Sequence, residues 1–298
     1  MKTVTLLDGG MGQELIRRSG KSPSPLWSAQ IMLDMPELVE QLHLDFIRAG
    51  STVITVNTYS ATPERLALQG QRDKFDALQA AAGAVALSAR EKSGVEGIRI
   101  AGCLPPLVAS YHPELAPPKD VSLQNYSKIV AAQSPYVDLF VCETMASKNE
   151  SVYAATAALE SGKPVWIALT LDDEKATCLR GGEPWQEAAN AVQQMGVDAI
   201  LLNCSRPETI SEVWQQFAAG CDVPVGAYAN CFNAVTALKP GGTVDSLETR
   251  QDLGPEAYAK FAMDWVEKGA TLIGGCCGVG PAQIARLRQE LSELTASF

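Results

Sequence analysis

The sequence predicts an α/β fold of the (β/α)8 TIM-barrel type, with an open, doubly wound parallel sheet as the second choice. Short apolar runs alternate with helical patterns along the whole chain, and this alternation is typical of parallel sheets. Gly50, Gly162, Gly196 and Gly269 each lie within three residues of the end of a predicted helix, as glycines often do where a helix ends. A length of 298 residues suits one barrel. We therefore expect a single domain over residues 1–298.

The predicted strands are apolar runs rich in β-branched residues, most of them followed by a polar or cysteine residue. They are Thr3–Leu7, Thr52–Val56, Ile98–Cys103, Val137–Cys142, Pro164–Leu169, Ala199–Leu202, Val223–Tyr228 and Ala270–Ile273. The predicted helices carry apolar residues at helical spacing, and several begin with a proline. They are Pro36–Ile47, Ala77–Arg90, Val121–Gln133, Glu150–Glu160, Pro184–Met195, Pro207–Phe217, Pro255–Glu267 and Pro281–Leu294.

Composition and charge exclude several classes of protein. The chain has 24 basic and 34 acidic residues and a net charge of −10, which argues against nucleic acid or an anionic membrane as a partner. The sequence contains no apolar run long enough to span a bilayer. The sequence has eight cysteines but does not begin with the charged and then apolar pattern of a secretion signal. We therefore expect no disulfide framework. We expect a soluble, cytoplasmic protein.

Polar side chains stand where the predicted strands end. In a barrel these ends meet at one mouth. Asp8 and Glu143 each close an apolar strand and are candidates to bind an ammonium group by charge-assisted hydrogen bonds. For Asp8 the alternative is a helix cap. Thr55 and Asn57 share one face of the second strand, so we expect them to line the upper interior of the barrel.

Cysteines end two more strands, as Asn203-Cys204 and as Gly274-Gly275-Cys276-Cys277-Gly278. Adjacent side chains of a regular strand point to opposite faces, but the flanking glycines permit a turn that brings both sulfurs to one side. Three thiolates with one open position suit a zinc ion that binds a fourth thiol. The alternative is that cysteines pack in the core, as small apolar residues do. We assign that role to Cys103, Cys142, Cys178, Cys221 and Cys231.

The residues that two other kinds of barrel enzyme need are missing from the strand ends. The two histidines are His43, in a predicted helix, and His112, in a proline-rich loop. Neither ends a strand, which disfavours a histidine–carboxylate metal hydrolase. Lysine ends none of the predicted strands, which disfavours a Schiff-base aldolase.

Five motifs carry a resemblance to a known family. They are, in order along the chain, Asp8-Gly9-Gly10, Asn57-Thr58-Tyr59, Glu143-Thr144, Asn203-Cys204 and Gly274–Gly278. With these motifs the chain resembles the homocysteine S-methyltransferase family over nearly its whole length. The segments Pro25–Ala29 and Pro36–Leu38 are most similar to the branch that uses S-methylmethionine or S-adenosylmethionine.

The resemblance implies a zinc-dependent (β/α)8 barrel that methylates L-homocysteine to methionine. It implies Cys204, Cys276 and Cys277 as ligands of Zn2+. It also implies that Asp8, Gly9 and Glu143 hold the amino-acid end of homocysteine, with Thr55 and Asn57 as further contacts.

The chain departs from the family pattern at Gln13, at Ala229 and in the segments Gly102–Pro106 and Ser110–Asp120. These regions face the expected donor side, so the identity of the donor stays open at this point, as does the oligomeric state. We predict a sulfonium donor, S-methylmethionine ahead of S-adenosylmethionine. The reason is that the aromatic rings of Trp27, in the first loop, and of Tyr59 can attract a cation.

Two alternatives remain. One is a metal- or thiol-binding barrel protein of the same fold that uses a different methyl donor or has no transferase activity. The other is a different barrel enzyme with a structural zinc, such as a lyase.

Overall fold

The computed structural model describes residues 3–21, 26, 28–240, 242 and 246–296. Its strands form one eight-stranded sheet in the order β1-β8-β7-β6-β5-β4-β3-β2. They are β1 (Thr5–Leu6), β2 (Val53–Thr55), β3 (Arg99–Leu104), β4 (Leu139–Met145), β5 (Val165–Leu169), β6 (Ala199–Asn203), β7 (Val225–Tyr228) and β8 (Leu272–Ile273). Each predicted strand corresponds to one of these.

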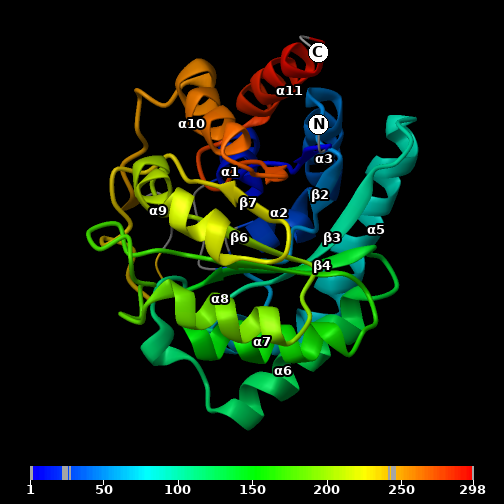
Figure 1. The fold of residues 1–298 in the computed structure, drawn as a ribbon. Helices are drawn as coiled ribbons and strands as arrows, with labels where there is room; N and C mark the ends of the chain where they lie inside the picture. Colours follow the sequence, from blue (N-terminus) through cyan, green and yellow to red (C-terminus); the bar gives the residue numbers. More distant parts are fainter. Residues whose placement is uncertain (1–2, 22–25, 27, 241, 243–245, 297–298) are drawn as a thin grey trace.

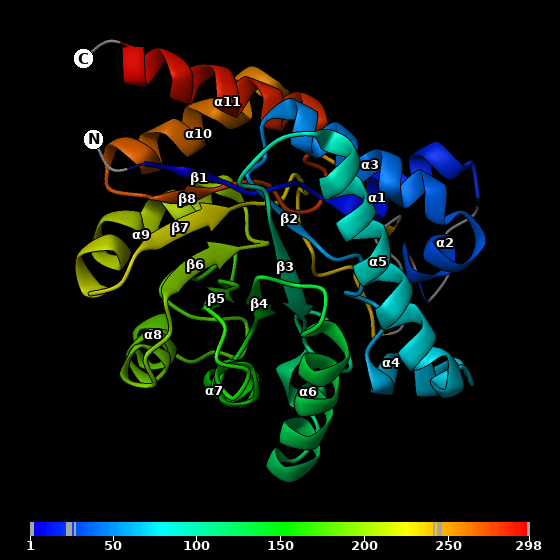
Figure 2. The same cartoon turned by 90° about the vertical axis from the view of Figure 1, so that its right-hand side faces the viewer.

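The sheet closes on itself. Strands β1 and β2 stand at the two ends of the order, and a parallel bridge between Leu7 and Val53 joins them. The backbone N–H of Thr52 also donates to the Leu6 carbonyl at 2.7 Å. Every neighbouring pair in the sheet is parallel, and Figure 2 shows the strands as a ring with the helices outside. The predicted (β/α)8 barrel is therefore confirmed.

Eight helices occupy the places that the sequence predicts and surround the barrel (Figure 1). They are α3 (Pro36–Ala49), α5 (Phe75–Ser93), α6 (Lys119–Gln133), α7 (Lys148–Leu159), α8 (Trp185–Gln194), α9 (Pro207–Gly220), α10 (Pro255–Glu267) and α11 (Pro281–Ala296). The glycines predicted as helix stops all have left-handed backbone conformations, with φ from 70° at Gly162 to 112° at Gly50.

Three short helices were not predicted: α1 (Met11–Ser19), α2 (Ser28–Asp34) and α4 (Pro63–Leu68). The first begins after Gly10 with no side-chain cap, and the second has only seven residues. Helices of this length depend on tertiary packing more than on local signals. They lie in the connections before and after β2, so they form part of the structure around the barrel mouth.

The barrel interior has its own apolar cluster, separate from the larger core between sheet and helices. It includes Leu7, Val53, Val141, Leu201 and Leu272, and Cys276 packs against it. Cys276 therefore lies against the apolar interior of the barrel, whereas Cys277 packs against a separate cluster that includes Phe232 and Leu238.

Among the described residues, no helix has the length and apolarity needed to cross a membrane. The cytoplasmic location and the single-domain organisation that we expect from the sequence stay predictions.

A buried histidine lies outside the barrel. His43 of α3 is fully buried, and neither of its ring nitrogens has a hydrogen-bond partner within the described part of the chain. Burial lowers the pKa of this imidazole from 6.5 to about 4. The folded protein therefore holds His43 neutral, since charging it here would place an unpaired cation in the core.

This burial predicts an acid-dependent loss of stability. As the pH falls below 6.5, the unfolded chain protonates His43 before the folded chain does, so the free energy of unfolding decreases until the pH reaches about 4. Between pH 7.5 and pH 5 the loss from this group is about 2 kcal/mol. Urea unfolding at both pH values should show that His43→Leu lacks this component. An equal pH dependence in the variant and the wild type would contradict the assignment.

Candidate active site

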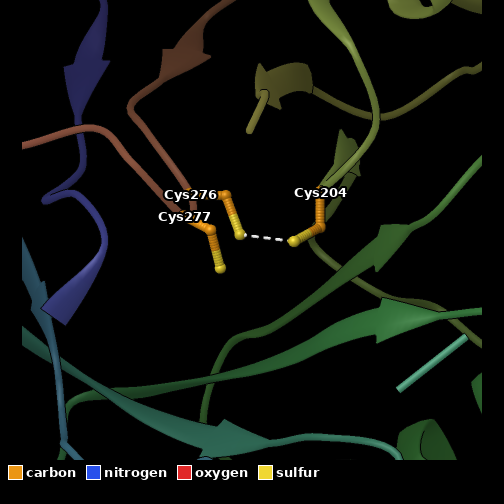
Figure 3. Close-up of side chains that lie close together, drawn as sticks. All are labelled: Cys204, Cys276 and Cys277. Atoms are coloured by element: carbon orange, nitrogen blue, oxygen red, sulfur yellow. Dashed lines mark hydrogen bonds between the residues drawn. The ribbon is translucent and has the colours of Figure 1, made fainter. Parts of the chain in front are cut away.

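Three cysteine side chains converge at the carboxyl end of the barrel. The thiol of Cys276 donates to the sulfur of Cys204, with the two Sγ atoms 2.8 Å apart. The Sγ atoms of Cys204, Cys276 and Cys277 all lie within 4.8 Å of one another. Figure 3 shows the Cys276 side chain directed toward Cys204, with Cys277 beside Cys276. The sequence predicted this group from two strand ends, and the structure brings it together.

A strained backbone positions Cys204. Its φ is 52°, in the left-handed region that β-carbon-bearing residues seldom adopt. Its carbonyl accepts a hydrogen bond of 2.8 Å from Nδ2 of Asn230, and its N–H donates to the Tyr228 carbonyl at 3.2 Å. These bonds from the end of β7 hold Cys204 so that its sulfur turns toward Cys276.

The other two cysteines are held by a tight loop after β8. The N–H of Cys276 donates to the Ala229 carbonyl at 2.9 Å, and the Cys277 carbonyl accepts from the N–H of Cys231 at 2.8 Å. A Cβ added at Gly275 would lie 2.0 Å from Cγ1 of Val279. Only glycine lets this loop fold so closely, which is the turn that the sequence predicted for the double cysteine.

Asp8 is held beside this group by the second strand. One of its carboxylate oxygens accepts from the backbone N–H of Thr55 at 2.7 Å, and the other accepts from the Thr55 hydroxyl at 3.2 Å. Helix α1 has Gly10 as its N-cap and no side-chain cap, so Asp8 is not the helix cap that the sequence left open. At Gly9 an added Cβ would lie 2.3 Å from the Val279 carbonyl oxygen, which ties this turn to the double-cysteine loop.

Glu143 faces the same space from β4. Its carboxylate accepts from the Cys103 thiol at 3.0 Å and from the Tyr228 hydroxyl at 3.3 Å. The register of β4 against β5 shifts between Cys142 and Met145, and Thr144 has a φ of 62°.

Asn203 supports this irregular turn. Its side chain accepts from the N–H of Thr144 and donates to the Thr144 hydroxyl, both at 3.0 Å.

The three cysteines, Asp8 and Glu143 line one cavity of about 120 Å³. Its wall contains every site residue that the sequence predicted: Asp8, Gly9, Thr55, Asn57, Glu143, Cys204, Cys276 and Cys277. Asn57 is turned partly aside, because its Nδ2 donates to the Ser28 carbonyl at 3.2 Å.

Burial governs the charges in this cavity. It raises the pKa of Asp8 to about 7, with the nearby Glu143 adding to the shift, and it raises the pKa of Glu143 to about 7. Two desolvated carboxylates in one space favour a cationic ligand, because a cation offsets their burial and their mutual repulsion. The hydrogen bond from Cys276 lowers the pKa of Cys204 well below its ordinary value, so this sulfur is the first of the three to ionise.

The structure adds residues that the sequence analysis did not select. The hydroxyl of Tyr111 lies 3.1 Å from the Cys204 sulfur, and Tyr111 belongs to the loop noted above only as divergent. Cys103 is buried as expected of a packing residue, yet its thiol also bonds Glu143. Tyr228 closes the seventh predicted strand, and that position is the signal that could have revealed it. Trp27 lies outside the described residues.

These features can be compared with known proteins. A family model described as homocysteine S-methyltransferase matches residues 5–291. The chain belongs to the homocysteine S-methyltransferase family. A homocysteine S-methyltransferase from Escherichia coli K12 is 29% identical, over 96% of this chain and 94% of its own length. Homocysteine S-methyltransferase 4 of Zea mays is 28% identical, over 97% and 89%.

A solved structure shares the fold. The metallated form of the homocysteine methyltransferase MmuM from Escherichia coli superimposes with a TM-score of 0.82 at 26% identity, covering 97% of this chain and 96% of that one. Family membership and a barrel of this kind confirm the resemblance that the sequence motifs indicated.

The double-cysteine loop generates a prediction about the metal affinity of the cysteine group. Gly275→Ala should displace Val279 and the Cys276–Cys277 loop, since the added Cβ overlaps the valine side chain. Displacement of a supporting contact lowers metal affinity about 10-fold or more. Titration with Cd2+, followed by its thiolate absorbance, measures the change. The matched control is Gly254→Ala, because nothing lies within 4 Å of its Cβ position. Equal Cd2+ affinity in both variants would contradict the prediction.

Proposed function

We propose that this protein transfers a methyl group from a sulfonium donor to the thiol of L-homocysteine and so forms methionine, with a zinc ion held by Cys204, Cys276 and Cys277. The observation that carries the proposal is one cavity in which these three sulfurs lie beside two buried carboxylates. Soft thiolate ligands favour zinc over hard cations such as Mg2+. The metallated form of MmuM supports metal binding in a relative.

The donor set fits such an ion. The three sulfurs are near enough to share one metal, and the described groups contain no fourth Cys, His, Asp or Glu within the same cluster. Three ligands with one free position are typical of catalytic rather than structural zinc. When bound, the metal would supply the positive charge that keeps a further sulfur ionised at neutral pH.

The carboxylates bind the amino-acid end of the acceptor in this proposal. Asp8 and Glu143 face the cavity with their oxygens oriented by Thr55, Cys103 and Tyr228. The ammonium group of homocysteine suits them, since a cation keeps both carboxylates ionised despite their burial. Gly9, Thr55 and Asn57 complete this wall.

The chemistry is charge-neutralising. The thiol proton of homocysteine passes to water first, and the sulfur then forms a bond to the methyl carbon as the bond between that carbon and the donor sulfur breaks. A thiolate and a sulfonium become two neutral thioethers, so exclusion of water favours the reaction. The apolar interior cluster beneath Cys276 provides that exclusion, and holding both reactants in one cavity supplies proximity.

The test of the proposal is a donor panel. Methionine formation from homocysteine is measured with S-methylmethionine, S-adenosylmethionine, betaine and methyl-folate side by side. We expect turnover with a sulfonium compound, S-methylmethionine ahead of S-adenosylmethionine. Turnover with betaine or methyl-folate alone would overturn the donor, and turnover with none would favour a binding protein without transferase activity.

Removal of one metal ligand should abolish both metal binding and activity. Cys277→Ser is expected to lose the zinc ion, measured as zinc per chain, together with methionine formation. The control is Cys221→Ser, because Cys221 lies outside the cavity. Full zinc occupancy in Cys277→Ser would refute the ligand assignment.

Loss of a carboxylate should weaken homocysteine binding without loss of zinc. Glu143→Gln removes one charged hydrogen-bond partner from a buried site, which costs roughly 2–3 kcal/mol of binding free energy. Calorimetric titration of the zinc-loaded protein with homocysteine measures this cost. If Asp8→Asn and Glu143→Gln both bind homocysteine with wild-type affinity, the carboxylates have only a structural role.

A further inference from the structure

An arginine without an acidic partner lines the active-site cavity. Arg65 of α4 forms part of the cavity wall and also of a smaller pocket, of about 40 Å³, beside Leu238 and Gly242. Its Nη2 donates to the Pro106 carbonyl at 3.0 Å and approaches the Ser110 hydroxyl at 3.4 Å. The guanidinium carbon lies 5.3 Å from the centre of the Tyr59 ring.

The position of this side chain is well defined. Thr62 caps α4 by accepting from the backbone N–H of Arg65 at 3.1 Å, and its hydroxyl donates to the Leu107 carbonyl at 2.6 Å. The first turn of α4 is thereby fixed to the segment after β3. The guanidinium is held by that segment, by Ser110 and by the Tyr59 ring.

The Arg65 guanidinium has no described carboxylate at salt-bridge distance, although burial raises the pKa of Glu150 and the charge of Arg65 lowers it in part. Within the part of the chain that the structure describes, Arg65 takes part in no ion pair (its closest contacts are neutral oxygens and a ring), although acidic residues outnumber basic ones by 34 to 24. Its Nε is buried and has no acceptor among those residues. A half-buried guanidinium with a free N–H favours an anionic ligand, and its planar shape matches a carboxylate.

Two carboxylates come into question for this guanidinium, that of homocysteine and that of the methyl donor. The ammonium and carboxylate groups of an amino acid share one carbon atom, so both must lie close to Asp8 and Glu143 in the proposed mode of binding. Arg65 pairs with neither of these residues and instead contacts Pro106 and Ser110. The second molecule in the cavity is the methyl donor.

We propose that Arg65 binds the carboxylate of the methyl donor and so selects onium compounds that carry one. This inference rests on the proposed methyl transfer and adds the recognition element for its second substrate. Pro106 and Ser110, which hold Arg65, belong to the two segments that depart from the family pattern. The divergent segments therefore contribute a carboxylate site. The sequence predicted that the Tyr59 ring attracts the sulfonium group. In the structure the Arg65 guanidinium covers one face of this ring.

The experiment compares two donors that differ only in this charge: S-methyl-L-methionine and its carboxamide. Values of kcat/KM are measured at saturating homocysteine for the wild type, Arg65→Gln and Arg65→Lys. The matched control is Arg72→Gln, an exposed arginine just after α4 that lies outside the cavity.

We expect the wild type to prefer the carboxylate donor by roughly 10- to 100-fold, the value of one charged hydrogen-bond partner. Arg65→Gln should lose this preference, because kcat/KM falls for S-methylmethionine and stays the same for the carboxamide. Arg65→Lys should retain part of it, Arg72→Gln all of it, and the KM for homocysteine should stay unchanged throughout.

Equal losses for both donors in Arg65→Gln would overturn the proposal and assign Arg65 to bracing of Pro106 and Ser110. An unchanged preference would overturn it as well. If the wild type transferred methyl groups from no donor, the proposed function would fail. Calorimetric titration with S-methylmethionine would then still test whether Arg65 binds the carboxylate. A Kd at least tenfold weaker in Arg65→Gln supports the carboxylate site, and an equal Kd contradicts it.

Discussion

The contact between the sulfur atoms of Cys204 and Cys276 joins positions 72 residues apart and sets the geometry of the whole site. A parallel barrel makes it possible, because the strands all end at one mouth. The local backbone must still bend for it. Cys204 takes a left-handed conformation held by Asn230, and the double-cysteine loop folds against Val279 at a place where only glycine fits. Strain in sparsely populated backbone regions is typical of functional sites.

Acidic and basic groups lie on different walls of the cavity. The two carboxylates and the sulfurs lie on the wall formed by β4 and the segments after β1, β6 and β8, whereas the cation of Arg65, which has no salt-bridge partner among the described residues, lies beside the segment after β3. Two amino-acid-like molecules could therefore be sorted by charge, with the ammonium group of one near Asp8 and Glu143 and the carboxylate of the other near Arg65. Such sorting would bring the two reacting sulfur groups together between these walls, and proximity of this kind is a large part of catalysis.

Sequence patterns located the barrel and the cavity wall but not the contacts that orient the site. Apolar runs and helix-then-glycine junctions predicted all eight strands and their covering helices, because both depend on local composition. Asp8, Glu143, Cys204 and the cysteine pair were found because each ends a strand. Tyr111 and Arg65 were missed, since they lie in connections whose path depends on tertiary packing. Helix α4, which carries Arg65, has only six residues and was not predicted. The thiol of Cys103 bonds Glu143 only because β3 pairs with β4 in one particular register.

The central claim is that the three cysteines hold a zinc ion whose open position accepts the sulfur of homocysteine. X-ray absorption at the zinc edge of the zinc-loaded protein, recorded with and without L-homocysteine, measures this directly. The account predicts three sulfur neighbours without the amino acid and a fourth when it is added. A zinc shell that keeps three sulfurs in saturating homocysteine, or one that holds fewer than three without it, would contradict the claim.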